Sequence, residues 1–233
     1  MRPDPSDPTV AALLEAALPH VAFEGWSPAV FRAAVESAGI APEVARAACP
    51  RGAVDLAVAY HLKGDRDMEA RLKDDPAMTE MKVREKIAHA IMVRLDVIPD
   101  KEAVRRGVAL FALPHMAAEG ARLTWGTADA IWRAVGDTSD DLNWYTKRAI
   151  LSGVWSATVI YWLGDDSWEG QGTRAFVERR IEDVMRFEKL KAQVRGSKLL
   201  RPFAAPLERF ASAVKAPSAR DRSDLPGRWH PQD

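Results

Sequence analysis

Apolar residues recur every three or four positions along almost the whole chain, and this spacing is the feature that most constrains the fold. In residues 81–98 it separates an apolar face from a charged one, as in an amphipathic helix. Strict alternation and Val/Ile/Thr-rich runs bounded by turn residues, which are typical of strands, are missing from the sequence. The 233 residues, 47% of them hydrophobic, are enough to bury a substantial core. We therefore predict an all-α fold.

Glycine and proline residues indicate where the helices begin and end. Gly25 suits the left-handed turn that closes a first helix, and Ser27-Pro28 is a typical start for the second. Residues 101–116 predict one helix kinked by Pro114, followed by a shorter helix that ends at Gly136. The longest apolar helix is expected over about 141–163.

Charge and cysteine content limit the compartment and the partners. The 33 basic residues balance 33 acidic ones, so no overall field attracts nucleic acid or an anionic membrane. Residues 191–233 are locally basic. The single cysteine, Cys49, cannot form an internal disulfide and is expected to be a small core residue. The N-terminal residues resemble neither a secretion signal nor a mitochondrial presequence, which favours a bacterial cytoplasmic protein or a mature form.

The sequence offers no recognisable catalytic or metal-binding arrangement. The five histidines are widely scattered. Glu85 and His89 are four apart and could share a metal, but a di-iron bundle needs paired Glu-x-x-His motifs, so a solvated charged pair is favoured. The sequence has no Gly-rich phosphate loop, nucleophile elbow or Cys-x-x-Cys. We expect no enzyme activity, no metal and no cofactor.

The N-terminal segment resembles the three-helix head of TetR-type regulators. Residues 9–62 contain EGWSPAVFRAAVESAGIAPEVARAACPRG, with a Gly-Trp junction, an AG turn and a short third helix. A recognition helix must offer cations to phosphates and polar groups to base edges. Residues 41–50 supply only Glu43 and Arg46. We therefore predict a helix-turn-helix-like head that does not bind nucleic acid.

The second half resembles the coenzyme Q (ubiquinone) biosynthesis protein nine family. Residues 136–167, GDTSDDLNWYTKRAILSGVWSATVIYWLGDDS, resemble its signature, and the resemblance extends over about residues 9–215. It implies a TetR-like fold, normally a homodimer, that binds an isoprenoid quinone intermediate or a phospholipid. It also implies that the chain presents this lipid to the di-iron demethoxyubiquinone hydroxylase and performs no chemistry itself.

Six of the eight tryptophans fall within residues 125–168, and the helix over 141–163 is apolar nearly all round. Such a helix is either ordinary core or one wall of a cavity for an isoprenoid chain. The family resemblance favours the cavity. The predicted lipid-binding residues are Ile91, Leu95, Phe111, Leu151, Val154, Trp155, Thr158, Trp162 and Ile181.

The first turns of the same helix combine aromatic and ionic groups. They could be a capped helix start with a solvated Arg148, or a protein interface, since Trp, Tyr and Arg are enriched at binding hot spots. The resemblance favours an interface, because the family uses the matching patch to bind its hydroxylase. The predicted partner-binding residues are Asp137, Asn143, Trp144, Tyr145 and Arg148.

Residues 196–216 predict an amphipathic helix flanked by basic residues, which is typical of a membrane-surface segment. A helix packed on the domain or at a dimer contact is the alternative. The predicted membrane-binding residues are Leu199, Leu200, Phe203, Leu207, Phe210 and Val214. With no stretch long enough to span a bilayer, the expected location is the inner face of the bacterial inner membrane, as a peripheral protein, or the matrix side for mitochondrial relatives.

The predicted organisation has five parts: a disordered N-terminus, the head, a lipid-binding and dimerisation core, the membrane helix and a disordered tail. Their ranges are 1–8, 9–62, 63–195, 196–216 and 217–233. The main alternative to the accessory protein is a TetR-like regulator that senses an apolar ligand. An unrecognised small-molecule enzyme is much less favoured.

Overall fold

The protein is built from α-helices joined by short turns. The computed structural model describes residues 3–140 and 142–196, and within these ranges it contains no strand. The predicted all-α fold is confirmed. The predicted membrane-binding residues and the predicted tail over 217–233 lie outside the described residues.

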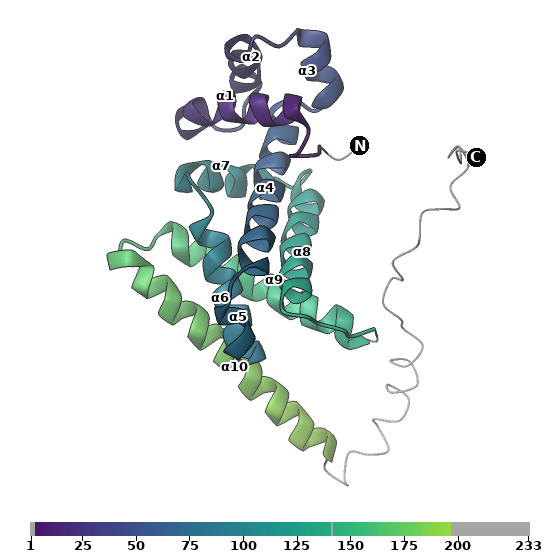
Figure 1. Cartoon of the computed structure of the whole chain (residues 1–233), viewed down its shortest axis with the longest axis vertical. Helices are drawn as coiled ribbons and strands as arrows, with labels where there is room; N and C mark the ends of the chain where they lie inside the picture. The colour runs from purple at the N-terminus through teal and green to yellow at the C-terminus, as the bar shows by residue number, and fades with distance from the viewer. Residues whose placement is uncertain (1–2, 141, 197–233) are drawn as a thin grey trace, which may run out of the picture.

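Three helices form the head, which lies at the top of Figure 1: α1 (Pro8–Glu24), α2 (Pro28–Ser37) and α3 (Pro42–Ala48). The residues predicted to end α1 and to begin α2 do so in the structure. Gly25, with φ 66°, follows α1, and the Ser27 hydroxyl accepts a hydrogen bond from the Val30 amide at 3.3 Å. The buried residues Leu13, Val21 and Val30 join Cys49 in a head core.

Helix α4 (Ala53–Lys73) runs from the head down into the body. Its first half, including Leu56, belongs to the head core, and its second half, including Met68 and Leu72, belongs to the body core. The two cores therefore share one continuous helix.

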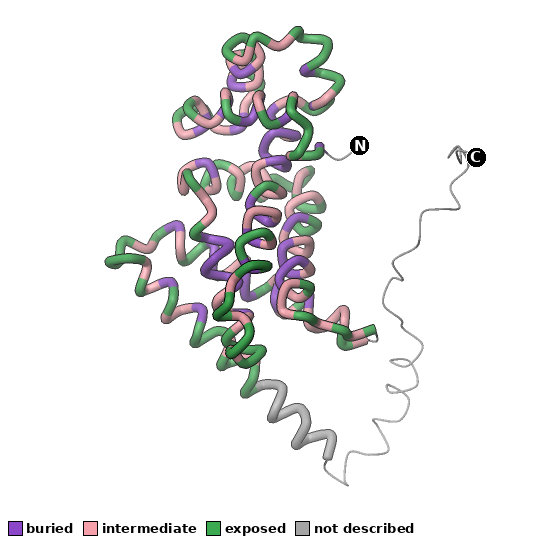
Figure 2. The backbone as a smooth tube through the Cα atoms, viewed as in Figure 1, coloured by how far each residue is buried: buried purple, intermediate pink, exposed green. Residues whose placement is uncertain are grey.

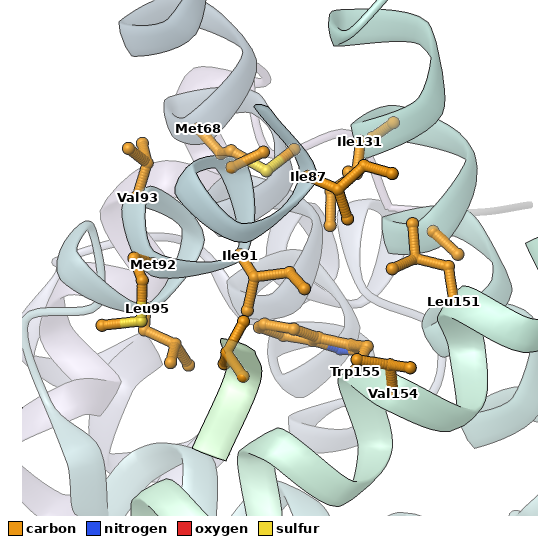
Figure 3. Close-up of a cluster of buried hydrophobic side chains, with 14 of the residues drawn as sticks. Met68, Ile87, Ile91, Met92, Val93, Leu95, Ile131, Leu151, Val154 and Trp155 are labelled. Atoms are coloured by element: carbon orange, nitrogen blue, oxygen red, sulfur yellow. The ribbon is translucent and has the colours of Figure 1, made fainter. Parts of the chain in front are cut away.

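The body is formed by α4 together with α6 (Val83–Asp96), α8 (Ala117–Ala134), α9 (Leu142–Leu163) and α10 (Gln171–Gly196). The buried residues concentrate where α4, α6 and α8 lie side by side (Figure 2). In the core, Ile91 of α6 and Trp155 of α9 point toward one another (Figure 3). A single turn of helix, α5 (Ala77–Glu80), precedes α6.

The segment around Pro114 differs from the prediction of one kinked helix. Helix α7 (Lys101–Phe111) ends before the proline, and α8 begins after it at Ala117. Proline lacks the amide that would continue the hydrogen-bond ladder, and the residue before it avoids the helical conformation. The chain therefore turns instead of bending, and α8 is longer than the short helix expected there.

Helix α7 lies across the junction of head and body (Figure 1). The Arg106 guanidinium donates hydrogen bonds to the Ala22 carbonyl at the end of α1, at 3.2 and 2.9 Å. Arg105 donates to the Leu163 carbonyl at the end of α9, at 2.7 Å. These bonds tie α7 to both parts of the molecule.

Candidate functional site

A cavity of about 530 Å³ lies at the junction of the head and the body. This volume falls in the range of small-molecule sites, about 300–1,000 Å³. Six helices supply its walls, and most of the lining side chains are apolar. They include Leu14 and Leu18 from α1, Ala57 from α4, Val97 after α6, Val104, Val108 and Phe111 from α7, Leu123 from α8, and Trp155 and Val159 from α9.

One buried cation, Arg94 of α6, is part of the wall of this cavity. Its side chain is 3% exposed, its Nε donates to Asp65 Oδ1 at 2.7 Å, and its Nη2 donates to the His61 carbonyl at 2.9 Å. The guanidinium lies against α4 at Gly64, where any side chain would overlap it. The ion pair and the glycine together determine where this charge lies.

Asp65 is held by a second chain of polar groups. The Thr127 hydroxyl lies 2.9 Å from Asp65 Oδ1, and His61 Nε2 lies 2.8 Å from the Thr127 oxygen. When Thr127 donates to the carboxylate, His61 must donate to Thr127, because a hydroxyl has one proton. The buried carboxylate is therefore hydrogen-bonded on the side of α8 as well as to Arg94.

Aromatic residues anchor the head side of the cavity. Trp26 Nε1 donates to the Ala103 carbonyl at 3.1 Å, and the Tyr60 hydroxyl donates to the Asp100 carbonyl at 3.0 Å. Burial raises the pKa of Tyr60 to about 12, so its phenol remains a neutral donor. These two bonds fix the start of α7 against the head.

The predicted lipid-binding residues occupy different surroundings. Phe111 and Trp155 line the cavity. Trp162 and Ile181 are partly buried against the body core, with the Lys101 ammonium 5.0 Å from the centre of the Trp162 ring. The remaining aliphatic residues lie in the body core itself: Ile91, Leu95, Leu151 and Val154 (Figure 3).

Thr158, the last predicted lipid-binding residue, is fully buried in α9. Within the described part of the chain, its hydroxyl is the one buried side-chain polar atom without a hydrogen-bond partner. The hydroxyl is not part of the cavity wall described above.

Arg94, Asp65 and Gly64 are not among the predicted site residues, although two signals in the sequence point to them. Arg94 interrupts the apolar run Ile91–Leu95, and Gly64 stands in the interior of a helical pattern, where it usually has a packing reason. The lining residues of α1 follow the ordinary apolar period of a core helix. No pattern in the sequence distinguishes them.

The predicted partner-binding residues lie together at the start of α9. Trp144 and Tyr145 are half-buried, with ring centres 4.8 Å apart, and Trp125 of α8 lies 6.0 Å from Trp144. Asn143 is exposed. The three rings form one aromatic cluster beside the surface.

Arg148 lies beneath this cluster and is buried, with 2% of its side chain exposed, rather than solvated. It pairs with Asp129 at 2.6 Å and Asp137 at 3.1 Å, and its guanidinium carbon is 4.0 Å from the Trp144 ring centre. Burial would raise the pKa of Asp137, but hydrogen bonds from Lys147, Ser139 and Arg148 lower it to about 2. Asp137 therefore helps to hold Arg148 against the Trp144 ring.

The described part of the chain contains no group of three or more His, Cys, Asp or Glu side chains placed to hold a metal. His89 Nε2 lies 2.6 Å from Asp75, while Glu85 accepts a hydrogen bond from the Lys82 amide. Burial raises the pKa of the Cys49 thiol to about 11, so it is a poor nucleophile. None of the described helices is both long enough and apolar enough to cross a membrane.

The fold and its cavity define an all-α, TetR-like protein with an internal site of small-molecule size. A TetR transcriptional regulator from Nitrosomonas europaea ATCC 19718 has a similar structure, with a TM-score of 0.62 and 18% sequence identity. The similarity covers 76% of this chain and 97% of the regulator. At this identity it establishes the fold.

Comparison of sequences points to one family. Residues 117–188 match the model of the COQ9 family. The chain is 27% identical over 192 residues to ubiquinone biosynthesis protein COQ9, mitochondrial, of Bos taurus, covering 79% of this chain and 60% of that protein. It is 28% identical to the probable ubiquinone biosynthesis protein coq9, mitochondrial, of Dictyostelium discoideum, covering 78% and 61%. The predicted resemblance to this family is confirmed, and the chain spans about 60% of the length of these relatives.

Proposed function

We propose that this chain is a lipid-binding accessory protein of ubiquinone biosynthesis that holds an isoprenoid quinone intermediate in the cavity between head and body. The observation that carries the proposal is the largely apolar cavity with one buried cation in its wall. The names of the relatives, which are ubiquinone biosynthesis proteins, supply the pathway. At about 530 Å³ the cavity suits the ring and the first part of a chain, so a long isoprenoid tail would extend out of it.

The same proposal assigns the aromatic cluster of Trp125, Trp144 and Tyr145 to a partner, the di-iron demethoxyubiquinone hydroxylase. Half-buried aromatic rings over a buried arginine are favourable for association, because they are already ordered before the partner arrives. The predicted membrane helix over 196–216 would keep the protein, as a homodimer, at the membrane surface where the lipid resides.

In this role the chain performs no catalysis. Of the charged groups at the cavity, Arg94 is paired with Asp65 and Lys63 with Asp67 at 2.5 Å, and Glu15 is exposed. The lipid would therefore be bound and presented, and the chemistry would be left to the hydroxylase.

Lipid extraction and mass spectrometry of the purified full chain test this proposal. We expect an isoprenoid quinone in the wild type and its loss in Gly107→Leu. Gly107 lines the cavity, and a side chain there would meet Trp26 Nε1 only at 3.7 Å, so the leucine would fill the space. Gly126→Leu is the matched control, because Gly126 has open space around it and is not part of the cavity wall. A wild-type protein that retains no isoprenoid would contradict the proposal.

A second candidate is a transcriptional regulator that senses an apolar ligand, and the similarity to the Nitrosomonas regulator favours it. Such a protein would also hold an apolar ligand. Binding to an operator duplex is what distinguishes it from the accessory protein.

A further inference from the structure

We infer that Arg94 binds the polar end of the ligand, and that this end is a neutral oxygen acceptor such as a quinone or ester carbonyl. The inference rests on the proposed function, since it concerns the same cavity. It adds the group that recognises the ligand and the chemical class of the ligand's polar end.

The geometry leaves part of the guanidinium available to a ligand. Nε donates to Asp65 and Nη2 donates to the His61 carbonyl, but Nη1 makes no hydrogen bond with any residue in the described ranges. Arg94 and the adjacent Gly64 both line the cavity. A buried cation that keeps unused N–H donors beside a largely apolar space is a donor for an acceptor that enters that space.

The position of these donors is fixed before a ligand arrives. Asp65 holds one edge of the guanidinium at 2.7 Å and is itself held by Thr127 at 2.9 Å. The guanidinium carbon lies 5.4 Å from the centre of the Trp155 ring, which is also part of the wall. A donor that is already ordered loses little entropy on binding, which increases its contribution to affinity and selectivity.

The charge balance indicates a neutral ligand. Asp65 neutralises Arg94 at 2.7 Å, Lys63 pairs with Asp67, and Glu15, the remaining charged residue of the wall, is exposed and negative. A carboxylate or phosphate would add an unbalanced negative charge beside the Asp65 carboxylate in a poorly solvated space. A carbonyl oxygen accepts a charge-assisted hydrogen bond without adding any charge.

Four probes of similar chain length separate these cases in calorimetric or dye-competition titrations of the delipidated full chain: a decyl-substituted benzoquinone, decylbenzene, methyl laurate and laurate. We expect the quinone to bind about tenfold more tightly than decylbenzene, as one hydrogen bond to a charged donor implies. Methyl laurate should bind more tightly than laurate. Preference for laurate would overturn the assignment of a neutral ligand.

In Arg94→Lys the ion pair with Asp65 can persist, but the guanidinium Nη1 donors that remain available to a ligand are lost. We expect the quinone and decylbenzene to bind this variant within about twofold of each other. Arg51→Lys is the control, because Arg51 also pairs with an aspartate, Asp55 at 2.7 Å, but does not line the cavity. An unchanged tenfold preference in Arg94→Lys would exclude Arg94 as the donor.

A measurement on the wild type alone covers the case in which Arg94→Lys does not fold. The infrared carbonyl stretch of bound methyl laurate should shift to lower frequency than in hexane, as expected for a hydrogen-bonded ester. An unshifted band, or equal binding of quinone and decylbenzene, overturns the inference and leaves the proposed function intact. If none of the four probes binds, the proposed function fails with it.

Discussion

Gly64 determines where the Arg94 guanidinium can lie, because a side chain at this position of α4 would overlap it. We expect Gly64→Ala to lower the free energy of unfolding by about 1–3 kcal/mol, the cost of disturbing a buried charged hydrogen bond. Gly126→Ala is the matched control in α8. No neighbouring atom lies close to its Cβ position, so the helix propensity of alanine should stabilise this variant by about 0.5–1 kcal/mol. Urea denaturation of both variants measures the difference, and a neutral Gly64→Ala would mean that Arg94 is not confined by α4.

Asp137 makes a pH-dependent contribution to stability. Its pKa is lowered to about 2 in the folded protein, against about 4 in an unfolded chain. A lowered carboxyl pKa stabilises the fold above the unfolded value, and that contribution is lost as the pH falls from about 4 to about 2. It amounts to about 2–3 kcal/mol at neutral pH. Asp137→Asn should lose this stability at neutral pH and show a flatter decline below pH 4, measured by urea denaturation across pH; a decline as steep as that of the wild type would contradict the assignment.

For single residues, the sequence predicts the chemical character of a site better than it predicts which side chains are buried. The aromatic and ionic character of residues 143–148 is plain in the sequence, but Arg148 is buried because Asp129 and Asp137, eleven or more positions earlier, pair with it. Arg94 is buried because Asp65, 29 positions earlier, lies opposite it. Such partners become visible only when the helices that carry them are packed.

Among the elements, α9 carries residues of both proposed sites along one helix. Its first turns carry the aromatic cluster, and its middle supplies Trp155 to the cavity. We expect Trp144→Ala to weaken binding of the demethoxyubiquinone hydroxylase by about 2 kcal/mol or more, as truncation of a hot spot does. Trp168→Ala is the control, since Trp168 is 77% exposed and belongs to the turn before α10.

The Trp144→Ala experiment needs a second readout, because Trp144 also covers Arg148. Calorimetric titration gives the affinity, and thermal unfolding gives the stability of the same sample. Equal loss of affinity in both tryptophan variants, or full affinity with a large loss of stability in Trp144→Ala, would remove the aromatic cluster from the interface.

Helix boundaries are predicted well wherever a local signal sets them. Ser27, Pro28 and Gly25 act within one turn of their own positions. The structure places the end of α1 and the start of α2 there. The break between α7 and α8 is also caused by a local residue, Pro114, but a proline can either kink or end a helix. The choice depends on how α7 packs across the junction, which is a tertiary effect.

For the whole molecule, the surface of the head distinguishes the two candidate functions. The exposed residues of α3 include Val44, Glu43 and Arg46, which together supply one cation and one anion. Because phosphate contacts dominate affinity for DNA, we expect no specific complex in gel shifts with genomic fragments at low salt. A complex of nanomolar affinity would favour the regulator and exclude the accessory protein.

The position of the cavity is the part of the whole molecule that the sequence predicts least. The predicted lining comes from α6 and α9 with one residue each from α7 and α10, whereas the observed wall also takes residues from α1, α4 and α8. Periodicity identifies which face of a helix is apolar. It does not identify which apolar faces fail to meet and leave a space between them.

The wall of the cavity is built from both the head and the body, and this offers a reason why the head has been kept in evolution. If the head does not bind DNA, as we predict, it would be free to erode if it stood alone on its own linker. Here α4 continues from one core into the other, and Leu14, Leu18 and Trp26 of the head close one side of the cavity. Deleting the head would open the cavity to water. Selection for ligand retention alone would therefore preserve these helices while the residues on their outer surface changed.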